Sequence, residues 1–217
     1  MTERQPKFLT NTKLKKNIIL IIILLLILFA IILTTVLFVF PFVRIRIFGI
    51  SLKPTEDIPI RQITYYTQND TKWRNDTIGN SNSTIGGVGC VISCVSTAIS
   101  DLENKSVTPQ EFNKIMTQVE GFDGAYLIWY KINEVFPDLN YRADRVFTRD
   151  TIESDLKNGF MPIVKVNMPV SGIEHWVIII GAKDGQFIIS DPLNGDRQPI
   201  PLSKYGKVYK YRVIIKN

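Results

Sequence analysis

The stretch "GGVGCVISCVSTAIS", residues 86–100, contains both cysteines of the chain, Cys90 and Cys94. Glycines crowd the positions before Cys90, and the residues after it are apolar or small, as in a helix that is buried nearly all round. We therefore predict a sharp glycine turn that leads into a helix over residues 90–102. In that setting the two thiols can form a disulfide, bind a metal, pack as apolar side chains, or divide into one nucleophile and one bystander.

The predicted helix start favours Cys90 as a nucleophile. The positive end of a helix stabilises a thiolate, and the same N–H groups can hold a developing oxyanion. Cys94 lies one turn further on the same face, where a disulfide to Cys90 has poor geometry. A zinc site with Cys90, Cys94, His175 and Asp191 has suitable ligand types but lacks the usual Cys-x-x-Cys pairing. We interpret Cys94 as a small buried core residue.

The one histidine of the chain, His175, begins the β-like run "HWVIIIGA" (175–182). A second run, "QFIISDP" (186–192), ends with Asp191 and follows a Lys-Asp-Gly turn signal. A tight hairpin would bring the start of the first strand to the end of the second. His175 and Asp191 would then meet as a base and the residue that orients it.

The rest of the region after residue 62 divides into a helical half and a strand half. Helices are predicted over 108–120, where Thr108, Pro109 and Glu111 form a helix start, and over 125–136 and 148–159. Further strands are predicted over 161–168 and 207–216. Helices followed by an antiparallel sheet indicate an α+β domain.

Three motifs of the chain, taken together, resemble those of a known peptidase family. The block "ITYYTQNDTKWRNDTIGNSNSTIGGVGCVISCVSTAI" (63–99), then "EHWVII" and "ISDPLNG", resembles papain-like cysteine peptidases of the C39-like branch. This branch is related to the peptidases that process bacteriocins at double-glycine leaders. The resemblance covers about residues 62–215, and it implies a papain-like fold and the hydrolysis of peptide bonds.

The resemblance also implies residue roles. Cys90 would be the nucleophile, His175 the general base and then acid, Asp191 its orienting partner, and Gln68 the amide of the oxyanion hole. Many members have glycine directly before the histidine, where this chain has Glu174, so an extra negative charge can lie near the imidazole.

Asp70 and Trp73 are expected to hold the loop around Gln68, and no metal or organic cofactor is implied. Two alternatives stay open for the same fold. One is an inactive module that binds peptides or cell-wall stems, and the other is a transglutaminase-type acyl transferase.

The N-terminal part carries a different signal. Residues 18–43 are apolar apart from Thr34, Thr35 and Pro41, and as a helix they would reach roughly 39 Å, enough to cross a bilayer. This run is longer than the hydrophobic region of a signal peptide. We predict a basic cytoplasmic segment 1–17, a transmembrane helix 18–43 in the lipid bilayer, a linker 44–61 and a peptidase domain 62–217.

Charge supports this organisation. The net charge of +6 lies entirely in residues 1–50, because residues 51–217 contain 19 basic and 19 acidic residues. The basic character therefore indicates a membrane anchor and not a nucleic-acid partner. Basic residues crowd the N-terminal border of the apolar run, so the positive-inside rule predicts a cytoplasmic N-terminus and an extracytoplasmic catalytic domain at the cell membrane.

Overall fold

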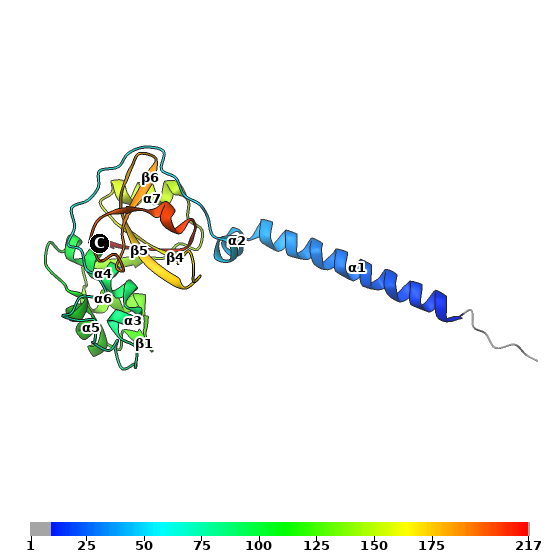
Figure 1. Cartoon of the computed structure of the whole chain (residues 1–217), viewed down its shortest axis with the longest axis horizontal. Helices are drawn as coiled ribbons and strands as arrows, with labels where there is room; N and C mark the ends of the chain where they lie inside the picture. Colours follow the sequence, from blue (N-terminus) through cyan, green and yellow to red (C-terminus); the bar gives the residue numbers. More distant parts are fainter. Residues whose placement is uncertain (1–9, 217) are drawn as a thin grey trace, which may run out of the picture. The chain divides into compact units, whose positions relative to one another are not determined.

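The computed structural model of the protein describes residues 10–216 and contains two compact units, residues 1–44 and 45–217. Figure 1 shows the course of the chain. Helix α1 (Thr10–Val39) belongs to the first unit, and its stretch Leu14–Phe38 is the one described helix that is long and apolar enough to cross a membrane. The hydroxyls of Thr34 and Thr35 donate to the carbonyl of Ile31, so neither polar group needs water.

The predicted span 18–43 is not one continuous helix. Helix α1 ends at Val39, and α2 (Pro41–Phe48) begins at Pro41. Proline lacks a backbone N–H and restricts the residue before it, so a helix tends to restart there. Residues 1–9 of the predicted cytoplasmic segment lie outside the described residues. The division into segment, span, linker and domain stays a prediction.

The segment predicted as a linker, 44–61, lies partly against the domain. Ile58 pairs with Ala182 through two backbone hydrogen bonds of 2.9 Å, and Ile50 pairs with Val208. A Cβ at Gly181 would come within 2.8 Å of the Ile60 Cα, so glycine permits this close approach. The segment therefore makes isolated bridges to the ends of strands β5 (Glu174–Lys183) and β8 (Val208–Lys216).

A six-stranded antiparallel sheet forms the centre of the second unit, in the order β3-β8-β4-β5-β6-β7. The strands are β3 (Leu139–Arg142), β4 (Pro162–Asn167), β5 (Glu174–Lys183), β6 (Gln186–Ser190), β7 (Ile200–Pro201) and β8 (Val208–Lys216). The four predicted strands correspond to β4, β5, β6 and β8. Strands β3 and β7 were not predicted, because they are short and lack a long β-branched run.

The turn between β5 and β6 has the predicted geometry. Asp184 and Gly185 adopt φ angles of 53° and 69°, as both central residues of a type I′ turn must. This turn sets the register in which Ile179 faces Ile189 and Ile178 faces Ser190, with an irregularity between Ile179 and Gly181. The hairpin therefore places the residue after Ser190 near the start of β5.

The helices of the second unit include α3 (Ile85–Val88), α4 (Cys90–Leu102), α5 (Pro109–Gln118) and α7 (Arg149–Lys157). Helix α4 has the predicted bounds. Thr108 with Glu111 forms the predicted helix start as a full capping box, and Thr148 caps α7.

The predicted helix 125–136 is wrong in its first half. Strands β1 (Phe122–Asp123) and β2 (Tyr126–Leu127) form a small hairpin there, followed by the 3-10 helix η1 (Trp129–Lys131) and helix α6 (Ile132–Val135). Gly124 has a φ of 58° and allows the turn that separates β1 from β2. Packing of the aromatic residues in this segment overrides their helical spacing.

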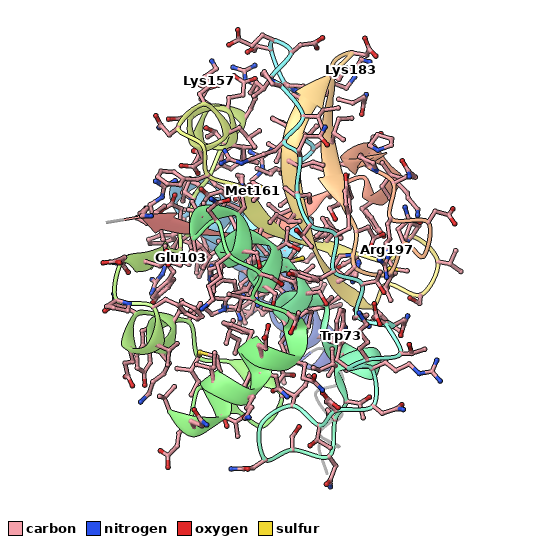
Figure 2. All side chains as sticks on the ribbon, turned by 90° about the vertical axis from the view of Figure 1, so that its left-hand side faces the viewer. Trp73, Glu103, Lys157, Met161, Lys183 and Arg197 are labelled. Atoms are coloured by element: carbon pink, nitrogen blue, oxygen red, sulfur yellow. The ribbon has the colours of Figure 1, made fainter. Side chains whose placement is uncertain are left out.

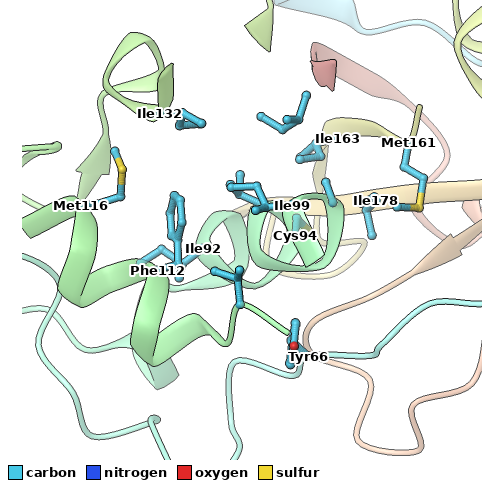
Figure 3. Packing of buried hydrophobic residues seen from close by; sticks show 14 of the residues in the cluster. Tyr66, Ile92, Cys94, Ile99, Phe112, Met116, Ile132, Met161, Ile163 and Ile178 are labelled. Carbon is cyan, nitrogen blue, oxygen red and sulfur yellow. The ribbon is translucent and has the colours of Figure 1, made fainter. Parts of the chain in front are cut away.

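The two faces of the sheet carry two apolar cores. Alternate residues of β5 point to opposite faces, so Ile178 and Ile180 join one core and Val177 and Ile179 the other. Helix α4 and the helical half cover the first face, where Figure 3 shows Ile99 of α4 close to Ile178. Ile152 of α7 packs in the second core. This arrangement holds the start of α4 beside β5.

Candidate active site

Cys90 is the first residue of α4, directly after the junction with α3. Gly89 forms this junction, and a Cβ there would lie 2.5 Å from the carbonyl oxygen of Ile85. The side chain of Thr84 caps α3 by accepting a hydrogen bond from the Gly87 N–H. The glycine turn therefore fixes the thiol at a helix start, where a negative charge is stabilised.

His175 lies between Cys90 and Asp191. Its Nε2 is 2.7 Å from Oδ1 of Asp191, and the Cys90 side chain is close enough to the same ring to act on the pKa of His175. Because Nε2 faces Asp191, Nδ1 is the ring nitrogen left for the thiol. His175 is only 2% exposed, so this contact is shielded from water. The structure brings these three side chains together, as the predicted hairpin requires.

The surroundings of His175 favour its charged form. Burial by itself lowers the pKa of His175, but hydrogen bonds and charge interactions with Asp191 and Cys90 outweigh burial and raise it to about 9. Burial raises the pKa of Asp191, but hydrogen bonds from His175 and Tyr205 outweigh this and lower it. An imidazolium beside a carboxylate is therefore the stable state of the pair near neutral pH.

Tyr205 is a site residue that the sequence did not reveal. It ends the 3-10 helix η2 (Leu202–Tyr205), and its hydroxyl donates a hydrogen bond to Oδ2 of Asp191. Its ring lies 5.7 Å from the ring of His175, and the Leu193 N–H also donates to Asp191. Tyr205 stands outside the quoted motifs and reaches Asp191 through tertiary packing, so no local pattern marks it.

Gln68 is buried beside the turn before Cys90. Its Nε2 donates to the carbonyl oxygen of Gly86 at 2.9 Å, and within residues 10–216 its Oε1 has no hydrogen-bond partner. The Gln68 backbone N–H donates to the carbonyl of Pro192, the residue after Asp191. The Gln68 loop is thus attached both to the turn before the thiol and to the loop that carries Asp191.

Asp70 and Trp73 hold this loop, as expected. The Trp73 indole N–H donates to the Thr67 carbonyl at 2.8 Å, and Arg197 forms an ion pair with Asp70 at 3.0 Å. Figure 2 labels both residues, the buried Trp73 and the exposed Arg197. Arg197 lies in the loop after Asp191, so this ion pair also connects the two loops.

Cys94 is packed in the core. It is a free thiol, as is Cys90, and its Sγ lies 3.5 Å from the carbonyl oxygen of Trp176. Figure 3 shows it among Ile92, Ile99 and Ile178. Burial, with smaller contributions from Cys90 and Asp191, raises the pKa of Cys94 well above its usual value. Cys94 therefore stays protonated.

Glu174 precedes His175 but pairs with a different residue. Its carboxylate forms an ion pair with Lys165 of β4, and hydrogen bonding to Lys165 lowers the pKa of Glu174. Neighbouring residues of a strand point to opposite faces. The extra carboxylate is consequently compensated by a cation and does not pair with the imidazole.

A cleft of about 640 Å³ opens beside the thiol. Its wall includes Cys90, aromatic side chains from the β2–η1 segment and β5, and charged side chains from β5 and β8. A thiol that lines an open cleft at a helix start, together with a buried imidazole and a buried carboxylate, forms the arrangement that thiol-dependent acyl transfer requires.

Comparison with known families agrees with this class of site. Residues 60–214 match the model of the peptidase C39-like family, and the chain belongs to that family. The family supports a peptidase-type function. No curated protein matches the chain.

Among solved structures, a protein from Bacillus anthracis described as a C39-like peptidase is similar, with 12% identity and a TM-score of 0.49 over 75% of this chain and 98% of that chain. At this level the similarity adds nothing to the family assignment.

Proposed function

We propose that the protein is a membrane-anchored cysteine peptidase that hydrolyses peptide bonds. The observation that carries the proposal is the position of His175 between Asp191 and Cys90, the residue of the three that lines the cleft. Membership of the peptidase C39-like family supports the same reaction class.

In the first step the Cys90 thiolate attacks the carbonyl carbon of the scissile bond. The carbonyl oxygen becomes an oxyanion, which the second hydrogen of Gln68 Nε2 and the backbone N–H of Cys90 would stabilise. The first N–H groups of a helix have no partner within the helix, so the Cys90 N–H suits this role. The His175 imidazolium gives its proton to the leaving amine as the C–N bond breaks, and a thioester on Cys90 remains.

In the second step the neutral His175 takes a proton from water, and the resulting hydroxide attacks the thioester. The C–S bond breaks, the carboxylic acid product leaves, and the thiolate–imidazolium pair forms again. Asp191 keeps the imidazole oriented and stabilises its charged form throughout.

The anchor in this proposal is helix α1 (Thr10–Val39), with its apolar stretch Leu14–Phe38 in the bilayer. Lys15 and Lys16 stand at the N-terminal border of the apolar run, which supports a cytoplasmic N-terminus. The catalytic domain would then face away from the cytoplasm and meet peptide or protein substrates there.

The experiment is covalent labelling of the detergent-solubilised full chain with a thiol-directed peptidase probe, together with hydrolysis of a peptide mixture. We expect Cys90→Ala to abolish both signals. The matched control is Cys94→Ser, which changes the buried thiol next to the Trp176 carbonyl. This variant should retain most of the probe labelling and most of the peptide hydrolysis.

Other outcomes contradict the proposal. Equal losses in the two variants would exclude Cys90 as the one nucleophile. Absence of any adduct in the unmodified chain would favour an inactive binding module, and incorporation of added amines in place of hydrolysis would favour an acyl transferase.

A further inference from the structure

The cleft beside Cys90 combines an apolar wall with charged groups. Among its lining residues, Tyr126, Leu127, Trp129 and Trp176 provide a broad aromatic and aliphatic surface. Such a surface can take an apolar or aromatic side chain of a peptide. The charged lining residues decide what else the cleft can accept.

Two cations on β8, Lys210 and Arg212, line the same cleft. Within the described part of the chain, neither forms an ion pair with a carboxylate, and the Nε of Arg212 is buried without a hydrogen-bond partner. One guanidinium nitrogen of Arg212 donates to the Tyr211 carbonyl at 2.7 Å, and the guanidinium lies 5.8 Å from the ring of Trp129. The side chain is thus held in place while part of its hydrogen-bonding capacity stays unused.

Among the described residues, Glu174 is the one acidic side chain that lines the cleft, and it forms its ion pair with neither of these two cations. Its ion-pair partner is Lys165, a buried residue whose ammonium group also lies 5.7 Å from the Tyr209 ring. Lys165 is thus the contact partner of Glu174, while Lys210 and Arg212 interact with Glu174 and Asp144 only at longer range, without a direct ion pair. Partly buried cations without a partner are costly, and a bound anion removes that cost.

Burial also weakens the charged forms of these two residues. Burial, followed by repulsion from Lys165, lowers the pKa of Lys210, and burial lowers that of Arg212. A ligand carboxylate would reverse both effects. Arginine binds carboxylates through two parallel hydrogen bonds, whereas an ammonium acts as a point charge.

We propose that Lys210 and Arg212 form a carboxylate-binding subsite, and that the enzyme selects peptides that carry a carboxylate close to an apolar or aromatic residue. The inference rests on the proposed peptidase function and specifies its substrate class. The carboxylate can come from an Asp or Glu side chain or from the C-terminus of the peptide, and the test separates these sources.

The test uses short peptide libraries in which one position at a time is fixed as Asp or as Asn. Each library is prepared with an amidated and with a free C-terminus. Hydrolysis is measured with the solubilised full chain, and equilibrium binding with its Cys90→Ala variant. The binding arm reports on the subsite even if the chain does not hydrolyse peptides, so failure of the inference and failure of the proposed function are distinguishable.

We expect Asp at one or more positions, or a free C-terminus, to be preferred over the neutral counterpart by about 10- to 100-fold. Arg212→Met and Lys210→Met should each reduce this preference. Lys183→Met, which removes an exposed cation at the tip of the β5–β6 hairpin (Figure 2), should keep it.

Equal hydrolysis and equal binding of charged and neutral libraries by the unmodified chain would overturn the inference, whether or not the variants fold. A preference that survives both substitutions at Lys210 and Arg212 would also overturn it.

Discussion

The Tyr205 hydroxyl donates a hydrogen bond to Oδ2 of Asp191, the oxygen that His175 does not use. Asp191 is therefore held from two sides, by His175 at one oxygen and by Tyr205 at the other. Burial and the interaction with Asp191 raise the pKa of Tyr205, so the phenol remains a donor. This contact fixes the carboxylate that orients the imidazole.

Tyr205→Phe keeps the ring beside His175 and removes the hydrogen bond. The second carboxylate oxygen is then buried without this donor, which should lower the free energy of unfolding by about 1–3 kcal/mol. We expect kcat to fall about tenfold with little change in KM, because the imidazole is less well oriented. Peptide hydrolysis and denaturant unfolding measure the two effects.

The matched control is Tyr130→Phe, since Tyr130 is 59% exposed. It should change neither quantity. A Tyr205→Phe enzyme with unchanged stability and kcat would show that Asp191 does not depend on this contact.

Gln68 gives a second prediction. Its Nε2 uses one hydrogen for the Gly86 carbonyl, which leaves the other for an oxyanion. Gln68→Ala should reduce kcat by about 100- to 1000-fold, because a donor to the transition state is lost. Labelling of Cys90 by a small reagent that alkylates thiols should be retained, because that reaction does not pass through an oxyanion.

Gln110→Ala is the control for this change. It also removes a hydrogen bond donated by a glutamine Nε2, here to the Asp76 carboxylate at 2.8 Å, outside the site. A similar loss of kcat in both variants would argue against an oxyanion role for Gln68.

The membrane orientation gives a third prediction. Treatment of intact cells with a membrane-impermeant thiol reagent should label Cys90, which is 9% exposed and lines the cleft, while Cys94, which is 1% exposed, stays unmodified. The signal should disappear in the Cys90→Ala variant. Labelling that requires permeabilised cells would place the catalytic domain in the cytoplasm and reverse the proposed topology.

Features with local signals were predictable from the sequence. The hairpin that joins His175 to Asp191 depends on β-branched runs and an Asp-Gly turn, and both are visible in the sequence. The bounds of α4 follow from the glycines before it and the apolar residues within it. The family resemblance then pointed to Gln68, whose side chain has no distinctive pattern of its own.

Features that depend on distant contacts were not predictable. Residues 125–136 have helical spacing, but Tyr126 and Leu127 pair with β1 instead. Tyr205 approaches Asp191 only because β7 and η2 bring the chain back to the sheet. The same holds for Lys165, which meets Glu174 through the pairing of β4 with β5.

The protonation state of His175 governs the proposed reaction. Its raised pKa means that the imidazolium, which donates the proton to the leaving amine, persists until the pH passes about 9. The interaction of the His175 imidazolium with its partners contributes fully to folding stability below pH about 6.5, the usual pKa of histidine. This contribution is lost as the pH rises through about 9. Peptide hydrolysis should therefore decline above pH about 9, and a decline between pH 6 and 7 would be inconsistent with this pairing.

The most direct test of the thiolate–imidazolium pair is an NMR titration of the imidazole of His175, because the chain has no other histidine. We predict one ring signal that titrates with a pKa of about 9 in the unmodified chain. In the Cys90→Ala variant the pKa should be lower, because a partner that raises it is lost. A pKa at or below 6.5 in the unmodified chain, or no change on removal of the Cys90 thiol, would contradict the account.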